Sequence, residues 1–138
     1  MRAFTAVLPA LLLLAACDDT TTGPSVAIGS EFQLRPSESV AVENTDAELR
    51  FDVVTSDSRC PADAICVWQG DATAVFSVRL GGASSSSLTL HTTGEDRHAS
   101  ASGLTLTLVR LDPYPYASRP ISPSDYRALL RVDPALDR

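Results

Sequence analysis

The sequence has no lysine, two histidines, three cysteines and one tryptophan among its 138 residues. Its basic residues are all arginine, and they are outnumbered 11 to 17 by aspartate and glutamate, for a net charge of −6. An acidic chain without a basic cluster is poorly suited to bind the phosphates of nucleic acid or anionic lipid headgroups. We therefore expect no nucleic-acid partner and no attachment to membranes through charge.

The scarcity of histidine also limits catalysis. A serine or cysteine nucleophile needs a neighbouring base, and only His91 and His98 are available. The sequence has no Gly-x-Ser-x-Gly motif, no phosphate-binding glycine loop and no cofactor motif. The sequence predicts a protein that is not an enzyme and holds no cofactor.

Two sets of polar side chains are weak candidates for a metal site. The first offers two imidazoles and two carboxylates close together in the chain: His91, Glu95, Asp96 and His98. The second offers three carboxylates of the kind that bind Ca²⁺: Asp57, Asp63 and Asp71. Neither set has the ligand spacing of a metal motif, so we expect solvated loops there, and a metal-dependent enzyme is only the third hypothesis for function.

Sustained helical stripes are absent as well, and apolar residues recur with a period of two. Between Glu48 and Val53 every second residue is apolar, which predicts a half-buried strand with Leu49, Phe51 and Val53 on one face. The strongest strand signal covers residues 103–112, where the apolar positions change parity at Leu108-Val109 and indicate a β-bulge or burial of both faces.

Counted along the chain, these patterns predict an all-β fold, a single antiparallel β-sandwich or small barrel of about seven strands. Residues 91–102 are polar and are predicted to form a loop. Ser122-Pro123-Ser124-Asp125 is predicted to begin a single helical turn before the last strand.

The N-terminus has the layout of a secretory signal, with Arg2 followed by an apolar run too short to span a membrane. Leu14-Ala15-Ala16-Cys17 resembles the lipobox of bacterial lipoproteins, which implies cleavage before Cys17 and a diacylglycerol on its thiol. The alternative is an ordinary signal peptide that contains a cysteine. We expect a signal at 1–16, a lipidated cysteine and flexible tether at 17–24, and a single β domain at 25–138, anchored in the bacterial cell envelope and facing the periplasm or the surface.

With Cys17 assigned to lipid, Cys60 and Cys66 remain, and disulfides persist in exported proteins. We predict a Cys60–Cys66 bridge. A loop this short gains only about 2 kcal/mol from the bridge, so its effect is mainly to fix the shape of the loop.

Candidate binding residues surround this loop: Asp57, Arg59, Asp63 and Trp68. The Asp57 carboxylate is predicted to accept a local backbone N–H in a turn, and Arg59 has Asp57, Asp63 and Asp71 as possible partners. The Trp68 indole either packs on the disulfide over the open end of the sheet, which we expect, or is an exposed anchor for a partner.

The run Asp57-Ser58-Arg59-Cys60-Pro61, followed by Cys66, Trp68 and Gly70, resembles a pattern of small uncharacterised bacterial lipoproteins. The resemblance implies a family and a compartment and no activity. Our first hypothesis is a non-enzymatic binding or structural module, with the membrane and possibly an envelope protein as partners. The alternative is an inhibitor of secreted proteases that uses Pro61–Ile65 as a substrate-like loop.

Overall fold

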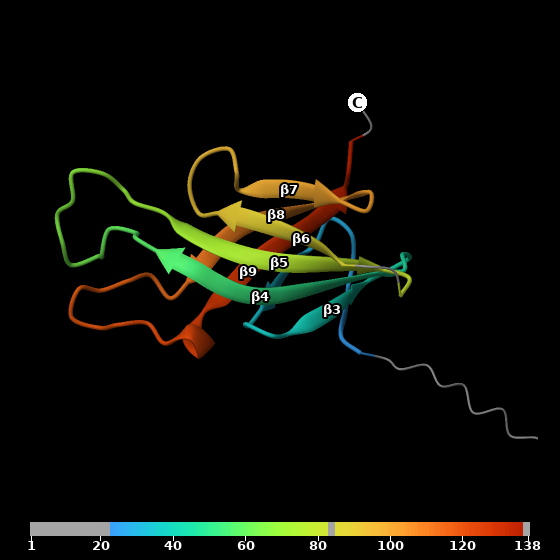
Figure 1. The fold of residues 1–138 in the computed structure, drawn as a ribbon, viewed down its shortest axis with the longest axis horizontal. Coiled ribbons are helices and arrows are strands. Elements are labelled where there is room, and N and C mark those ends of the chain that lie inside the picture. Colours follow the sequence, from blue (N-terminus) through green and yellow to red (C-terminus); the bar gives the residue numbers. More distant parts are fainter. Residues whose placement is uncertain (1–22, 83–84, 137–138) are drawn as a thin grey trace, which may run out of the picture.

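The computed structural model describes residues 23–82 and 85–136, and within them the chain forms two sheets packed face to face (Figure 1). In order across the first sheet, its strands are β1 (Ser25–Val26), β3 (Ser39–Val42), β4 (Ala47–Asp57), β5 (Ala72–Leu80) and β6 (Ser86–His91). The second sheet consists of β2 (Glu31–Leu34), β9 (Arg127–Pro134), β8 (Leu104–Asp112) and β7 (His98–Ala101). A 3₁₀ turn, η1 (Pro123–Asp125), precedes β9 as predicted.

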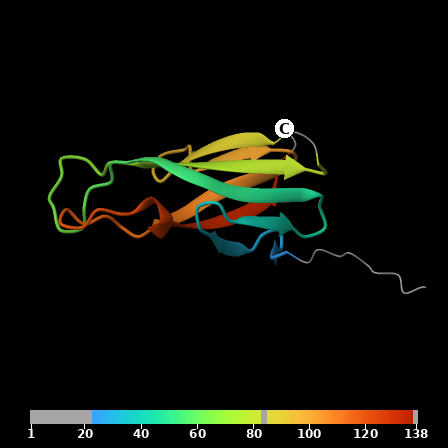
Figure 2. The ribbon, with the colours of Figure 1, turned by 60° about the horizontal axis from the view of Figure 1, so that its bottom comes forward.

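The all-β prediction is confirmed, and the architecture is a sandwich rather than a closed barrel (Figure 2). All strand pairs are antiparallel except β1 with β3. The alternation patterns miss two short strands, β1 and β7, because neither has enough apolar residues to show a period. The predicted loop over residues 91–102 is therefore wrong at His98–Ala101, which pairs with β8.

The core lies between the sheets and is built from the alternate residues of the long strands. Phe51 and Phe76 are paired across β4 and β5, and their rings stack with centroids 4.9 Å apart. Both are almost completely buried, as are Leu49 and Leu90 from the same sheet and Leu108 from the other. Burial of this apolar surface is the main favourable term in folding.

Two irregularities in β4 change which residues face the core. The pairing with β5 shifts between Phe51 and Val53 and again between Val54 and Ser56, so that Asp52 and Thr55 have no partner in the register. The prediction that Val53 shares the buried face is wrong: Val53 is 41% exposed, while Val54 packs against the core. After the second shift, Asp57 is opposite the buried Ala72 and so faces the interior.

The parity change in β8 is also a bulge. The register with β9 runs from Leu108–Leu130 directly to Arg110–Leu129, which leaves Val109 as the extra residue. Leu108 and Leu111 are consequently both buried, and the β-bulge is confirmed.

Two long loops gather at one end of the sandwich: the loop between β4 and β5, and the one between β8 and β9 (left in Figure 1). The first strand of the described chain, β1, lies far from this end of the first sheet. Ser25 of β1 pairs with Ala41, and Ala41 pairs with Glu48 near the start of β4. The β5 partners of Glu48 and Asp57, Arg79 and Ala72, are about 23 Å apart along the strand. The described residues contain no helix long and apolar enough to cross a membrane, and the predicted lipidation site Cys17 lies outside them.

Truncation of Phe51 tests which residues of β4 face the core. Phe51→Ala should lower the free energy of unfolding by about 3–5 kcal/mol, because it removes a fully buried ring and leaves a cavity against Phe76. Val53→Ala, two residues further along β4, should cost less than about 1 kcal/mol, since Val53 faces outward. Urea unfolding of both variants measures the difference, and equal losses would contradict the bulged register.

Candidate functional site

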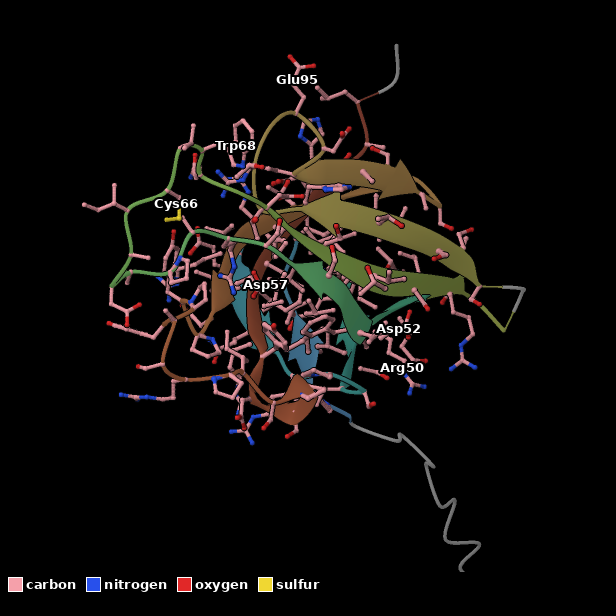
Figure 3. All side chains as sticks on the ribbon, turned by 60° about the vertical axis from the view of Figure 1, so that its left-hand side comes forward. Arg50, Asp52, Asp57, Cys66, Trp68 and Glu95 are labelled. Atoms are coloured by element: carbon pink, nitrogen blue, oxygen red, sulfur yellow. A yellow bond between two sulfur atoms is a disulfide. The ribbon has the colours of Figure 1, made fainter. Side chains whose placement is uncertain are left out.

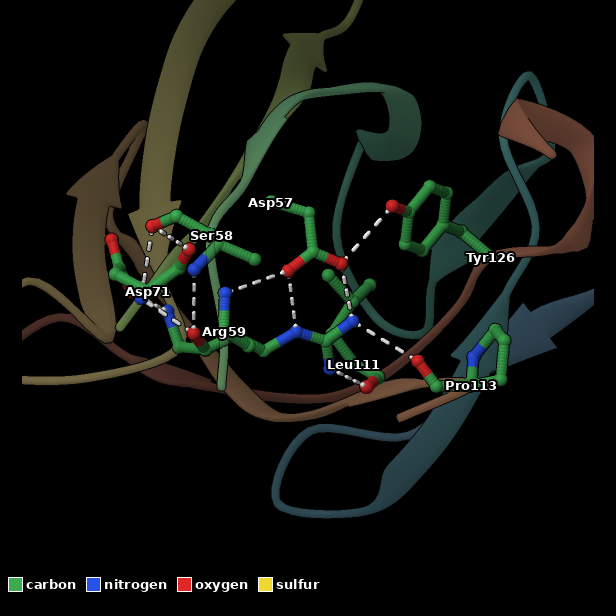
Figure 4. Close-up of polar contacts among 9 residues, drawn as sticks. Asp57, Ser58, Arg59, Asp71, Leu111, Pro113 and Tyr126 are labelled. Atoms are coloured by element: carbon green, nitrogen blue, oxygen red, sulfur yellow. Dashed lines mark hydrogen bonds and ion pairs between the residues drawn. The ribbon is translucent and has the colours of Figure 1, made fainter. Parts of the chain in front are cut away.

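A buried ion pair closes the end of the sandwich from which the two long loops leave (Figure 4). The Arg59 guanidinium forms a two-pronged contact with the Asp57 carboxylate: Nε donates to Oδ1 at 2.9 Å and Nη2 to Oδ2 at 2.6 Å. The side chains are only 5% and 11% exposed. Parallel N–H···O bonds of this kind are the strong, orientation-specific form of a charge pair.

The same pair connects the two sheets. Asp57 ends β4, whereas Arg59 donates through Nη1 to the Leu111 carbonyl at 2.6 Å and through Nη2 to the Pro113 carbonyl at 3.0 Å, both at the end of β8. The Tyr126 hydroxyl, just before β9, donates to Asp57 Oδ2 at 3.1 Å. The Asp57 carboxylate also accepts the Arg59 backbone N–H at 3.2 Å, the local turn that the sequence predicts.

The protonation of these groups follows from their contacts. Burial by itself would raise the pKa of Asp57, but the hydrogen bonds and the charge of Arg59 outweigh burial, and the pKa is lowered. Burial, together with the adjacent Asp57 charge, raises the pKa of Tyr126 to about 12. Tyr126 therefore stays a neutral donor and Asp57 a charged acceptor near neutral pH, and we call the hydrogen-bonded pair of Asp57 and Arg59 the clamp.

Gly70 allows the hairpin to continue beyond the clamp. Ser58 N–H donates to the Asp71 carbonyl at 2.7 Å, and Cys60 N–H donates to the Gln69 carbonyl at 2.8 Å. The two arms of the hairpin therefore stay paired up to the disulfide. Gly70 has a φ of +72°, and a Cβ there would lie 1.9 Å from the Ser58 carbonyl oxygen. Only glycine fits this approach of two backbones, which explains its place in the Cys-x-Trp-x-Gly run.

The predicted Cys60–Cys66 disulfide is present, with Cα atoms 5.9 Å apart. The loop that it closes rests on the neighbouring long loop: Ala62 N–H donates to the Pro115 carbonyl at 2.9 Å, and Ala117 N–H to Asp63 Oδ1 at 2.7 Å. Asp63 therefore connects the two loops and does not pair with Arg59. Of the three carboxylates predicted as possible partners of Arg59, only Asp57 forms an ion pair with it.

The prediction that the Trp68 indole packs on the disulfide is wrong. Trp68, labelled near Cys66 in Figure 3, is 80% exposed. Its neighbours Val67 and Ile65 are exposed by 94% and 103%. Contacts with the adjacent loop are made through the backbone and Asp63, so these three apolar side chains are left in solvent. One of these residues lies inside the disulfide-closed loop and two lie directly after it, and we call the surface that they form the apolar loop tip.

The weak metal candidates do not converge. Within residues 23–82 and 85–136, no three side chains of histidine, cysteine, aspartate or glutamate are placed to hold a metal ion. His91 instead contacts Asp71, with Nδ1 2.6 Å from Oδ2. Asp71 Oδ1 accepts the backbone N–H and the hydroxyl of both Thr92 and Thr93, at 2.9–3.1 Å. The three carboxylates of the Ca²⁺ hypothesis, Asp57, Asp63 and Asp71, thus each have separate protein partners.

The sequence interpretation missed Tyr126 as part of the site. Tyr126 directly precedes the last strand, and nothing in the surrounding sequence identifies its hydroxyl as a partner of Asp57. The Leu111 and Pro113 groups that bind Arg59 are backbone carbonyls, so their residue types do not predict the contacts.

Removal of the arginine tests the clamp. Arg59→Met should lower the free energy of unfolding by about 3–5 kcal/mol, because the Asp57 charge is left buried without its partner. Arg50→Met is the matched control: Arg50 pairs with Asp52 on the surface and is 52% exposed, so its loss should cost less than about 1 kcal/mol. Asp57→Leu/Arg59→Met should recover part of the loss, and urea unfolding that finds Arg59 no more costly than Arg50 would contradict the clamp.

The Asp71 contacts predict a specific response to acid. Burial opposes ionisation, but the bonds from His91, Thr92 and Thr93 outweigh it and lower the pKa of Asp71 from 3.8 to about 2. A carboxylate whose pKa is lower in the folded state stabilises the fold above pH 4, and this contribution, at most about 2 kcal/mol, is lost as pH falls from about 4 to 2. Asp71→Asn should flatten the dependence of unfolding free energy on pH in that window. Parallel curves for the variant and the wild type would show that Asp71 makes no such contribution.

Comparison with known proteins adds no relative to this picture: no family model, no curated protein and no solved structure matches the chain.

Proposed function

We propose that the protein is a non-enzymatic module of the bacterial cell envelope, anchored by lipid on Cys17, that contacts another envelope protein through the apolar loop tip. The observation that carries the proposal is the exposure of Ile65, Val67 and Trp68 together on a loop held in one shape. Exposed apolar groups of this kind mark interaction sites, and tryptophan is among the residues that contribute most to binding.

Rigidity supports the same role. The disulfide, the backbone bond from Ala62 to Pro115 and the Asp63–Ala117 contact constrain the loop, and the Arg59 clamp fixes its base. A loop that is already ordered loses less conformational entropy on binding. The loop therefore has the features of a preformed contact surface.

The position of the loop fits a protein held at its N-terminus. The apolar loop tip leaves from the end of β4, whereas Ser25 joins the sheet near the start of that strand (Figure 1). The predicted tether from Cys17 to Pro24 can extend by up to about 26–29 Å. Anchored in this way, the domain would present its loop away from the point of attachment.

The inhibitor alternative has less support. A substrate-like segment is extended, so that its backbone can pair with a protease. Here the backbone turns, since Ala64 N–H donates to the Pro61 carbonyl at 3.1 Å, and the Ala62 N–H is already bound to Pro115. We therefore favour a contact made by side chains.

Site-specific photo-crosslinking in the native membrane tests the proposal. A photoreactive residue in place of Val67 should give one discrete adduct with an envelope protein, and the same residue in place of Val53, on the outer face of β4, should not. In the Val67 background, Trp68→Ala should reduce the adduct at least tenfold, because a central aromatic contact is lost. Cys60→Ser/Cys66→Ser should reduce it less, because only the loop shape is loosened.

Identical adducts from positions 67 and 53, or an adduct that Trp68→Ala leaves unchanged, would overturn the proposal. An adduct formed only with lipid would move the contact from a protein to the membrane.

A further inference from the structure

A hollow of about 220 Å³ lies beside the clamp, at the same end of the sandwich. Its wall is formed by the base of the β4–β5 hairpin at Arg59 and Gly70, by the bulged part of β8, and by three residues of the segment that joins β6 to β7: Thr92, Thr93 and Arg97. Trp68 is not part of the wall, so the hollow is distinct from the apolar loop tip.

Within the described residues, the wall carries one uncompensated positive charge in an otherwise acidic protein. It contains three arginines, Arg59, Arg97 and Arg110, and no aspartate or glutamate. Arg59 is neutralised by Asp57, and Arg110 Nε pairs with Asp112 at 2.8 Å. Arg97 has no carboxylate within 4.0 Å in the part of the chain that the structure describes, so its charge is not compensated there.

Each of the three guanidinium groups has at least one N–H group without a hydrogen-bond partner among the described residues. Arg97 uses Nη2 to bind the Leu108 and Val109 carbonyls, at 3.3 and 2.6 Å, and its Nε and Nη1 have no partner among the described residues. Arg110 uses only Nε. The buried Arg59 makes four side-chain bonds with its five N–H groups, and the remaining one is on Nη1.

The Arg97 guanidinium is held at the bulge in β8, where its Nη2 donates to the Leu108 and Val109 carbonyls. The rest of the wall is partly apolar, with Val109 and the ring of Tyr114, which lies 5.4 Å from the Arg59 guanidinium carbon. The hollow thus combines fixed cationic groups with an apolar surface.

We propose that this hollow binds a small organic monocarboxylate of about the size of benzoate. Among the described residues, Arg110 keeps both Nη groups free, and their parallel N–H donors match the two oxygens of a carboxylate. Arg97 adds single donors from Nε and Nη1, and Tyr114 and Val109 would contact the apolar part of the ligand. A cavity of about 150 Å³ holds benzene, so 220 Å³ has room for a ring and a carboxylate. A single negative charge suits the site better than a phosphate dianion, because Asp112 already pairs with Arg110 and the chain carries a net charge of −6.

Titration of the full chain with benzoate, followed by NMR or calorimetry, tests the proposal. Benzoate should bind, and benzamide, which has the same shape without the charge, should bind at least tenfold more weakly. Arg97→Gln should weaken benzoate binding at least tenfold. Arg35→Gln is the control, because it removes the same charge from an exposed arginine outside the hollow and should change the affinity less than twofold.

Two further arms identify the source of the carboxylate and separate this proposal from the role of the loop. N-acetylphenylalanine that binds more tightly than benzoate would identify the C-terminal carboxylate of a peptide as the natural form of the ligand, and weaker binding would favour a free small acid. Trp68→Ala should leave benzoate affinity unchanged. No benzoate binding at millimolar concentration, equal binding of benzamide, or an unchanged affinity in Arg97→Gln would overturn the proposal.

Discussion

The buried pair of Asp57 and Arg59 is the constraint on which this end of the molecule depends. Asp57 ends the longest strand of one sheet, and Arg59 binds two carbonyls at the end of a strand in the other. Both charges are nearly excluded from water, so each needs the other and the surrounding donors and acceptors. The position of the β4–β5 loop relative to the second sheet is set here, because the hairpin continues directly from the clamp to the disulfide.

Much of the fold follows from local physical rules. Alternating apolar residues identify the long strands, and the assignment of one cysteine to lipid leaves the pair that forms the observed disulfide. The partner of Arg59 is the carboxylate nearest to it in the chain, which a sequence can suggest. The parity change at Leu108-Val109 is a visible trace of the bulge, because an extra residue reverses the inside–outside order.

Other features depend on contacts between distant segments and leave no local trace. The first shift in β4 falls within the regular alternation between Glu48 and Val53, so the pattern does not predict that Val53 faces outward. The second shift lies beyond that run, where no alternation predicts the inward direction of Asp57. Trp68 is exposed because the neighbouring loop meets the disulfide loop through backbone groups and Asp63, and those contacts join residues about fifty positions apart. The arginine-lined hollow likewise forms only where three segments of the chain meet, and the spacing of residues in the sequence does not predict that meeting.

The order of the strands also bears on how the protein behaves when many copies are crowded together. The four longest strands, β4, β5, β8 and β9, all lie inside their sheets, and the edges are formed by strands of two to six residues. Exposed edges are the parts of a sheet that recruit strands from other molecules, and short edges offer few unpaired backbone groups for this. Association of neighbouring copies through their sheets is therefore disfavoured.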